Sequence, residues 1–302
     1  EAAMKHSYKE FKEKYDVQLN EQQEKALRKT EGATLLLAVP GSGKTTVIIN
    51  RVGYMIYCKS IKPKNILTLT FTLAAAEEMS ARFVKKFSYT EKDCPKFATI
   101  HSFCVSVINK CISSPHLCGD EVIKKLQLEP NNERIIRSIC VKECSEYPTD
   151  ALIKDVAQKI TFAKNSMLSP LEIQRIKVSG VKFDTIFDKY EQHKKDNNLM
   201  DFDDQLSLAY TYLQKYPRVL EHYQNKFKYL GIDEAQDTSF IQHKIIQLLA
   251  SRDNNIFMVG DEDQSIYAFR SAFPKALLTF KQTYRDAEVL YMETNYRSCS
   301  EI

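Results

Sequence analysis

The chain has 302 residues, of which 43% are hydrophobic and 27% charged, and its formal net charge is +4. This length allows about two domains with a sizeable core, and the composition is that of an ordinary globular protein. A membrane-spanning segment is excluded because no run of ~20 apolar residues occurs. The small positive charge permits contact with nucleic acid without requiring it.

The N-terminal residues 1–10 mix acids and bases and contain no apolar core of signal-peptide length. The eight cysteines include no Cys-x-x-Cys pair, which favours free cytosolic thiols. As an alternative, Cys140 and Cys144 would share a helical face and bind a metal, although no second pair supports this. We therefore expect a cytoplasmic protein with no membrane partner.

Short apolar runs rich in Leu, Ile, Val and Thr are typical of buried strands. They lie at Thr34–Val39, Ile66–Thr70, Phe97–Ile100, Tyr229–Ile232, Ile256–Val259 and Glu288–Met292. Helical patterns follow the first three runs, at Lys44–Cys58, Leu73–Phe87 and His101–Ile112. This alternation predicts an α/β fold with a parallel sheet and crossover helices. Between about Asn109 and Asn198 the apolar stripes have helical spacing only, which predicts an all-helical insertion into a discontinuous sheet domain.

A phosphate-binding loop is predicted at Ala38–Thr45, directly after the first strand and at the start of a helix. Glycines let the backbone N–H groups turn around phosphate oxygens, Lys44 reaches the β and γ phosphates, and Thr45 can ligate Mg²⁺. Ala38 departs from the glycine usual at the first position. The predicted phosphate-binding residues are Gly41, Ser42, Gly43, Lys44 and Thr45.

Asp233 and Glu234 follow the strand Tyr229–Ile232, where a metal-binding carboxylate should face a phosphate loop. We expect Asp233 to bind Mg²⁺ and Glu234 to orient and deprotonate the attacking water. A helix N-cap is the alternative for such a pair, and the phosphate loop upstream favours catalysis.

Further motifs occur in a fixed order along the chain. They are Leu19–Ala26, Thr70–Thr72 with Ala75–Met79, Thr99–Phe103, Met200–Asp204, Asp233–Thr238, Gly260–Arg270 and Glu293–Ser298. This series resembles UvrD/Rep-type superfamily 1 DNA helicases, from the Q motif through motif IV, and Gly260–Arg270 is its most specific part. The resemblance implies a RecA-like P-loop NTPase domain, with ATP and Mg²⁺ as ligands.

The resemblance also implies roles at the ATP site. Gln23 would read adenine, Gln264 would sense the γ-phosphate, and Arg297 would contact that phosphate when two motor domains close. Tyr296 would stack on adenine, although a packed strand tyrosine is an alternative. Thr46 completes the predicted nucleotide set, at a position where an adenine-packing arginine is common.

For single-stranded DNA the useful side chains are aromatic faces and small phosphate donors. The resemblance implies that Phe71, Thr72, Thr99, His101, Ser102, Phe103, Tyr267, Phe269 and Arg270 lie on the DNA path. Any single aromatic residue among them has a core position as its alternative. Leu73-Ala74 replaces the common Asn-Lys, and Phe269 replaces the usual Trp. With Thr46, these departures lead us to expect weaker nucleotide or strand binding than in a typical member.

By the same resemblance, residues 1–108 and 198–287 form domain 1A, residues 109–197 form insertion 1B, and residues 288–302 begin domain 2A. Motifs V and VI and domain 2B are absent from the sequence. We expect a monomeric fragment that binds ATP, single-stranded DNA and duplex junctions but turns over poorly. The intact parent would be a 3′-to-5′ helicase or translocase.

Three alternatives remain open. The chain is the motor part of a helicase–nuclease, a DNA-binding scaffold without catalysis, or a generic P-loop kinase or GTPase. Intact Lys44, Asp233, Glu234, Gln264 and Arg297 disfavour the scaffold. Gln23 and the Gly260–Arg270 block disfavour the kinase or GTPase.

Overall fold

The computed structural model describes residues 5–262 and 275–294. The chain divides into two units, each built from separate segments. The sheet unit comprises Glu1–Ser102, Leu220–Thr238 and Ile246–Ile302, and the helical unit comprises Phe103–Val219 and Ser239–Ile245. In the described part of the chain, no helix is long and apolar enough to cross a membrane.

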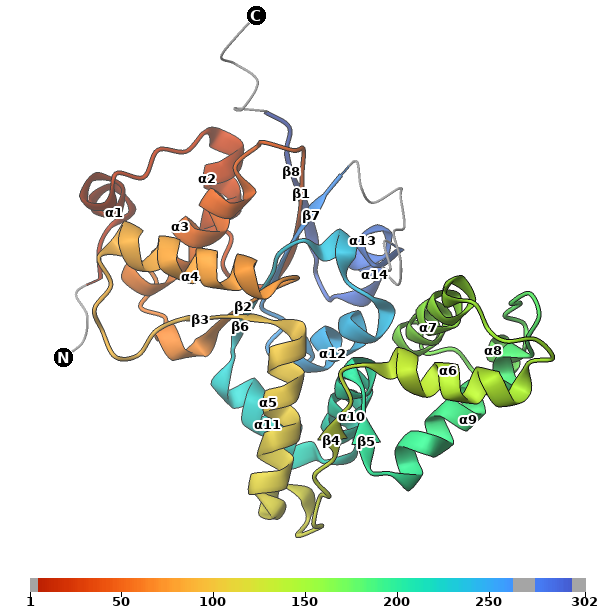
Figure 1. The fold of residues 1–302 in the computed structure, drawn as a ribbon. Helices are drawn as coiled ribbons and strands as arrows, with labels where there is room; N and C mark the ends of the chain where they lie inside the picture. Colours follow the sequence, from red (N-terminus) through yellow and green to blue (C-terminus); the bar gives the residue numbers. More distant parts are fainter. Residues whose placement is uncertain (1–4, 263–274, 295–302) are drawn as a thin grey trace, which may run out of the picture. The chain divides into compact units, whose positions relative to one another are not determined.

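Six parallel strands form the central sheet of the sheet unit, in the order β3-β2-β6-β7-β1-β8 (Figure 1). They are β1 (Ala33–Ala38), β2 (Ile66–Thr70), β3 (Lys96–Thr99), β6 (Tyr229–Ile232), β7 (Ile256–Asp261) and β8 (Glu288–Met292). Each of the six predicted apolar runs is a strand. The predicted α/β fold with a parallel sheet is confirmed.

The helices within the sheet unit bury their apolar side chains against the sheet or against one another. They are α1 (Tyr8–Tyr15), α2 (Glu21–Arg28), α3 (Lys44–Tyr57), α4 (Leu73–Phe87), α13 (Lys275–Leu278) and α14 (Phe280–Thr283). Side chains of α2, α3 and α4 pack on the sheet through Ala26, Val47, Ile48 and Met79. Three further helices cross the division between the units: α5 (Ile100–Ser113), α11 (Pro217–Lys226) and α12 (Phe240–Ala250).

Strand β8 corrects the expected domain boundary. Residues 288–292 were expected to begin the next domain, but β8 pairs with β1 from Thr34↔Glu288 to Ala38↔Met292. The Val39 N–H also donates to the Met292 carbonyl oxygen at 3.0 Å. These five residues therefore complete the sheet that carries the phosphate loop.

The helical unit contains α6 (Asn132–Glu143), α7 (Asp150–Asn165), α8 (Pro170–Gln174), α9 (Phe183–Asp196) and α10 (Phe202–Lys215). Their buried apolar side chains, among them Ile136, Val156, Ile186 and Tyr190, form one core. The expectation of helices alone between 109 and 198 is wrong in one detail. A short strand, β4 (Gln127–Leu128), pairs in parallel with β5 (Leu199–Met200).

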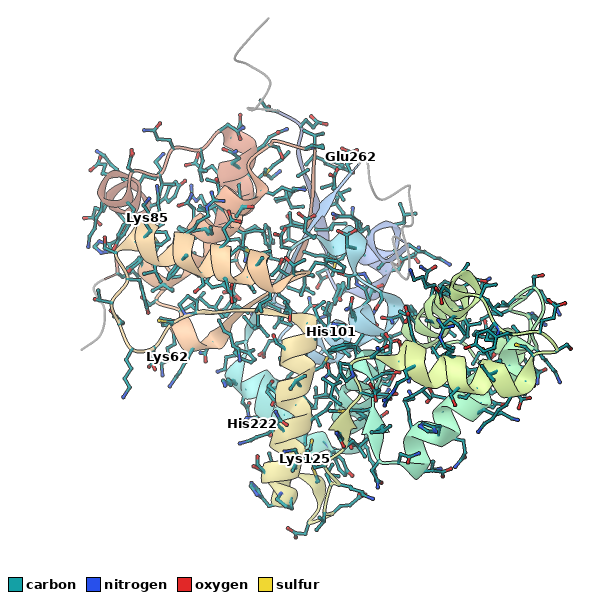
Figure 2. All side chains as sticks on the ribbon, in the orientation of Figure 1. Lys62, Lys85, His101, Lys125, His222 and Glu262 are labelled. Atoms are coloured by element: carbon teal, nitrogen blue, oxygen red, sulfur yellow. The ribbon has the colours of Figure 1, made fainter. Side chains whose placement is uncertain are left out.

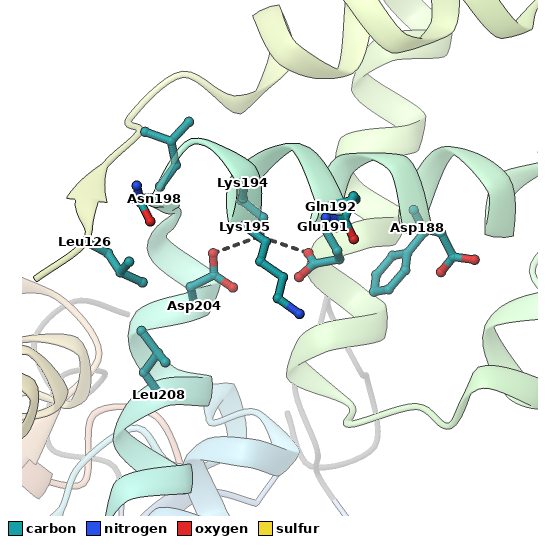
Figure 3. A pocket seen from close by; sticks show the side chains of 11 residues that line it. Leu126, Asp188, Glu191, Gln192, Lys194, Lys195, Asn198, Asp204 and Leu208 are labelled. Carbon is teal, nitrogen blue, oxygen red and sulfur yellow. Dashed lines mark hydrogen bonds and ion pairs between the residues drawn. The ribbon is translucent and has the colours of Figure 1, made fainter. Parts of the chain in front are cut away.

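A buried ionic network joins α7, α9 and the start of α10. The Lys194 ammonium contacts Asp201 at 3.0 Å, Asp204 at 2.7 Å and Glu191 at 2.9 Å, as Figure 3 shows for Asp204 and Glu191. Lys164 contacts Asp204 and lies 3.2 Å from Glu191. The Met200–Asp204 motif thus anchors three helices of this unit to one another.

Candidate active site and nucleic-acid interface

The phosphate loop joins β1 to α3 through two glycines in the left-handed region. Gly41 has φ 79° and Gly43 has φ 86°, values that L side chains rarely adopt. Gly43 is the N-cap of α3 and has no side chain with which to cap it. The first N–H groups of a helix have no intrahelical acceptor, so phosphate oxygens suit this end. Ala38 ends β1 in regular pairing, so glycine is not required there.

Gln23, at the start of α2, packs against this loop. Its amide nitrogen donates to the Ser42 carbonyl oxygen at 2.8 Å, and its amide oxygen accepts from the Asn20 N–H at 3.0 Å. The Ser42 hydroxyl donates to the Val39 carbonyl oxygen at 2.7 Å. An amide has two N–H groups and two acceptor lone pairs, so these two hydrogen bonds use only one N–H and one lone pair of Gln23.

Lys44 projects from the loop toward the end of β7. Its ammonium lies 3.9 Å from the Asp261 carboxylate, which is almost fully buried. The pairing holds the ammonium close to the loop. Phosphate oxygens would have to compete with Asp261 for this ammonium.

Asp233 and Glu234 directly follow β6, at the same carboxyl end of the parallel strands as Asp261. Burial and the nearby Glu234 carboxylate raise the pKa of Asp233 to about 6, while the Glu234 N–H and Lys44 oppose that rise. The Glu234 N–H donates to the Asp233 carboxylate at 2.9 Å. Glu234 itself has φ 51°, a left-handed conformation that costs a non-glycine residue ~1–2 kcal/mol.

Asp233 and Thr45 suit a magnesium ion that is also bound by a nucleotide better than a metal ion held by protein ligands alone. Within residues 5–262 and 275–294, no group of three or more His, Cys, Asp or Glu side chains could hold a metal ion. Mg²⁺ in phosphate sites keeps several waters and takes one or two protein ligands plus phosphate oxygens. The Asp233 carboxylate and the Thr45 hydroxyl provide a donor set of that kind.

A groove beside the loop was not foreseen from the sequence. Its volume is about 530 Å³, and its lining residues are Thr46, Ile49, Asn50, Arg82, Lys85 and Lys86. Lys85 is labelled on α4 in Figure 2. Asn50 is buried, and its amide oxygen has no partner among the described residues. Three cations, Arg82, Lys85 and Lys86, thus line one cavity next to α3, whereas the Asn50 amide oxygen is itself buried.

Two of the lining residues, Thr46 and Asn50, lie on the same stripe of α3 as Gly43, which packs against Gln23. Gly43, Thr46, Asn50 and Gly53 lie on one stripe of α3, because residues three or four apart share a helical face. A Cβ on Gly43 would stand 2.8 Å from the Gln23 amide nitrogen. Gln23 therefore marks the loop end of the stripe that lines the groove.

The predicted nucleic-acid residues gather where β2 and β3 end. Thr70 and Thr99 are register partners, so the segments after them leave the sheet side by side. Phe71 is 57% exposed. The Thr72 oxygen accepts from the Ala75 N–H at 3.1 Å and so caps α4, but its hydroxyl hydrogen can still donate to a phosphate.

Thr99 and Ser102 cap the start of α5 reciprocally. The Ser102 N–H donates to the Thr99 hydroxyl oxygen at 3.0 Å, and the Thr99 N–H donates to the Ser102 hydroxyl oxygen at 3.1 Å. His101 lies between them in the first turn of the helix (Figure 2). Helix capping accounts for these two hydroxyl groups without a ligand.

Phe103 is a correction. Its side chain is only 1% exposed, so its ring offers no face to a base. The other predicted residues Gln264, Tyr267, Phe269, Arg270, Tyr296 and Arg297 lie outside the described residues.

A parallel sheet, a Gly-Ser-Gly-Lys-Thr loop between β1 and α3, and an acidic pair after β6 define a RecA-like P-loop NTPase domain. The family model of the UvrD/REP helicase N-terminal domain matches residues 19–285. The chain belongs to this family.

Similar curated proteins include the ATP-dependent DNA helicases PcrA of Staphylococcus aureus and Staphylococcus epidermidis. Each is 32% identical over 286 residues, which are 94% of this chain. The chain spans 38% of the length of these relatives.

Proposed function

We propose that this chain is the ATP-binding and single-strand-binding part of a 3′-to-5′ DNA helicase or translocase. The observation that carries the proposal is the convergence of Lys44, Asp261 and the Asp233–Glu234 pair at one edge of the sheet. The direction of movement rests on the family resemblance alone.

The roles at the ATP site follow from the chemistry of each group. The loop N–H groups and Lys44 hold the phosphates, while Thr45 and Asp233 hold Mg²⁺. When bound, this ion neutralises developing charge on the phosphates. Glu234 accepts a proton from the attacking water. Gln264 and Arg297 are proposed to sense and stabilise the γ-phosphate.

The base end of the nucleotide is proposed to enter the groove between α3 and α4. Gln23 reads the base at the loop end, with Thr46 beside it and Tyr296 as a stacking face. Arg82 contributes positive charge to the same groove.

Single-stranded DNA is proposed to pass the edge formed by the ends of β2 and β3. Phe71 stacks on a base, and Thr72 and His101 donate to phosphates. Ser102 would join them only by turning its hydroxyl away from the Thr99 carbonyl oxygen, to which it donates at 2.9 Å. Tyr267, Phe269 and Arg270 are proposed to extend this path. We expect the complete protein to bind duplex junctions.

We assign residues 1–108 and 198–292 to domain 1A and residues 109–197 to insertion 1B, with the following residues leading into domain 2A. Because the chain spans 38% of its relatives' length, we expect the full-length protein to carry the activity. These residues alone would bind nucleotide and hydrolyse it slowly, since cleft closure assembles the catalytic geometry.

The test is ATP hydrolysis by the full-length protein with and without single-stranded DNA, followed by unwinding of a 3′-tailed duplex. We expect strand-stimulated hydrolysis that Lys44→Ala abolishes. A rate of hydrolysis that does not increase with single-stranded DNA, or that is unchanged in Lys44→Ala, would contradict the proposal. Unwinding of a 5′-tailed duplex instead of the 3′-tailed one would contradict only the proposed direction of movement.

A further inference from the structure

Gln236 lies two residues beyond Glu234 and its side chain is buried within the sheet unit. Its amide nitrogen donates to the Glu234 carboxylate at 2.5 Å, and its amide oxygen accepts from the Asp261 N–H at 3.0 Å. A carboxylate can only accept and a backbone N–H can only donate. The two partners therefore fix which end of the amide faces which group.

We propose that Gln236 is a positioning residue that holds the Glu234 carboxylate for the attacking water and ties it to Asp261, the ion-pair partner of Lys44. The inference rests on the proposed ATPase function. It concerns a side chain that touches Glu234 but none of the reacting atoms.

The conformation of Glu234 is the first reason. Glu234 holds a left-handed backbone conformation at φ 51°, which surrounding contacts must maintain. The Glu234 N–H donates to the Asp233 carboxylate, and the Glu234 carbonyl oxygen accepts from the Asp237 N–H at 3.0 Å. These bonds hold the backbone, and the Gln236 amide is what holds the carboxylate.

The remaining capacity of the carboxylate is the second reason. Gln236 binds one Glu234 oxygen, Oε2, so Oε1 can still accept a proton from water. A carboxylate fixed through one oxygen presents the other in a single direction. Misplacing a catalytic group by ~1 Å costs about 10²-fold in rate.

The connection to β7 is the third reason. The amide oxygen binds the N–H of Asp261, whose carboxylate lies 3.9 Å from the Lys44 ammonium. Glu234, Gln236, Asp261 and Lys44 thus form one continuous chain of contacts. A phosphate that draws Lys44 away from Asp261 acts on the same strand end that orients Glu234.

The test uses the full-length protein and separates kcat from nucleotide affinity. Gln236→Leu should lower kcat about 10- to 100-fold, while the Kd for MgATP changes less than about threefold, because no phosphate ligand is removed. Gln236→Glu keeps an acceptor for Asp261 and loses the donor to Glu234, so its kcat should fall similarly.

Gln224→Leu is the matched control. Gln224 is also buried in the sheet unit, and its amide donates to the Leu248 carbonyl oxygen at 3.0 Å and to the Ser251 hydroxyl at 3.1 Å. Its loss should lower stability and leave kcat within about twofold, because buried hydrogen bonds contribute to folding wherever they lie.

A double-mutant cycle with Glu234→Gln decides the inference. If Gln236 acts through Glu234, Gln236→Leu has little further effect on kcat once Glu234 is replaced. An equal fall in both backgrounds, or wild-type kcat in Gln236→Leu, would overturn the inference and leave the proposed function intact. Absence of turnover in the wild type would overturn the proposed function, and this inference with it.

Discussion

The side-chain amide of Gln23 donates to the Ser42 carbonyl oxygen at 2.8 Å, so the first turn of α2 rests on the phosphate loop. The next loop residue, Gly43, has no room for a side chain, because its Cβ would stand 2.8 Å from the same amide nitrogen. The proposed base-reading residue and the proposed phosphate loop therefore share one packed contact.

Gly43→Ala should weaken both the fold and nucleotide binding. The new methyl group displaces a Gln23 amide that two hydrogen bonds hold, and φ 86° strains alanine by ~1–2 kcal/mol. We expect the free energy of unfolding to fall by about 2–3 kcal/mol and MgATP affinity to fall at least about tenfold, because the loop cannot keep its shape. Urea unfolding and calorimetric titration measure the two effects.

Gly32→Ala is the control for this change. Gly32 has φ 81°, and a Cβ at this position would meet nothing within 4 Å in the described part of the chain. The variant should lose ~1–2 kcal/mol of stability from strain alone, with unchanged MgATP affinity. Equal losses of affinity in both variants would disprove the link between Gln23 and the loop.

Phe71→Ala should lower affinity for single-stranded DNA by about 1–3 kcal/mol, the contribution of one stacked base. Because Phe71 is 57% exposed, the free energy of unfolding should hardly change. Fluorescence anisotropy of a labelled oligothymidine measures the binding. The same loss in Leu278→Ala, another exposed apolar residue, would show a non-specific effect.

Phe103→Ala should behave in the opposite way. The ring is almost fully buried, so its removal should cost about 3–5 kcal/mol of stability. DNA affinity measured on the folded fraction should stay close to that of the wild type. A DNA defect without a loss of stability would restore Phe103 to the DNA path.

Thr46→Arg and Ala74→Lys test whether the two departures from the family pattern weaken binding. An arginine in the groove would face the base, and this should add about 0.5–1 kcal/mol of MgATP affinity. A lysine at exposed position 74 should strengthen single-strand binding and steepen its salt dependence. Each variant serves as the control for the ligand that the other is designed to bind. The hypothesis is refuted if neither variant gains affinity.

Asp201→Asn should make the free energy of unfolding depend less on pH in the acidic range. Burial alone would raise the pKa of Asp201, but Lys164 and Lys194 outweigh it and lower the pKa from 3.8 to about 2. A carboxyl with a lowered pKa stabilises the folded state above its ordinary pKa and loses that contribution as the pH falls through the folded value. The contribution is about 2 kcal/mol, of which roughly half is lost at pH 3.

Urea unfolding followed by circular dichroism at pH 7 and pH 3 measures this dependence. The gap in stability between the wild type and Asp201→Asn should narrow by about 1 kcal/mol at the lower pH. Asp196→Asn removes an exposed carboxylate from the same unit and should show no such narrowing. A constant gap would mean that the two lysines do not hold Asp201 ionised.

The strands of the sheet were predictable because a buried parallel strand needs a continuous apolar run. Ile66–Thr70 and Tyr229–Ile232 match their strands in the structure at both ends. The two-residue strands β4 and β5 were missed because so short a segment has no periodicity. The place of β8 depends on its pairing with β1, which lies far away in sequence.

In the candidate site, too, residues in local motifs were predictable, and features that depend on tertiary packing were not. Local motifs indicated Lys44, Asp233 and Glu234, because strand-end loops carry their side chains to one edge of a parallel sheet. The groove was missed because Asn50 and Arg82 line it from two different helices and belong to no contiguous motif. Phe103 was misassigned because a motif does not reveal which face of a helix is buried.

The most direct test of the account is equilibrium binding of MgATP to these 302 residues, compared with Lys44→Ala. We expect saturable binding by the wild type and at least about tenfold weaker binding by the variant, since Lys44 supplies the charge that faces the phosphates. No saturable binding by a folded wild type, or equal binding by both proteins, would contradict the assignment of this loop as the ATP site.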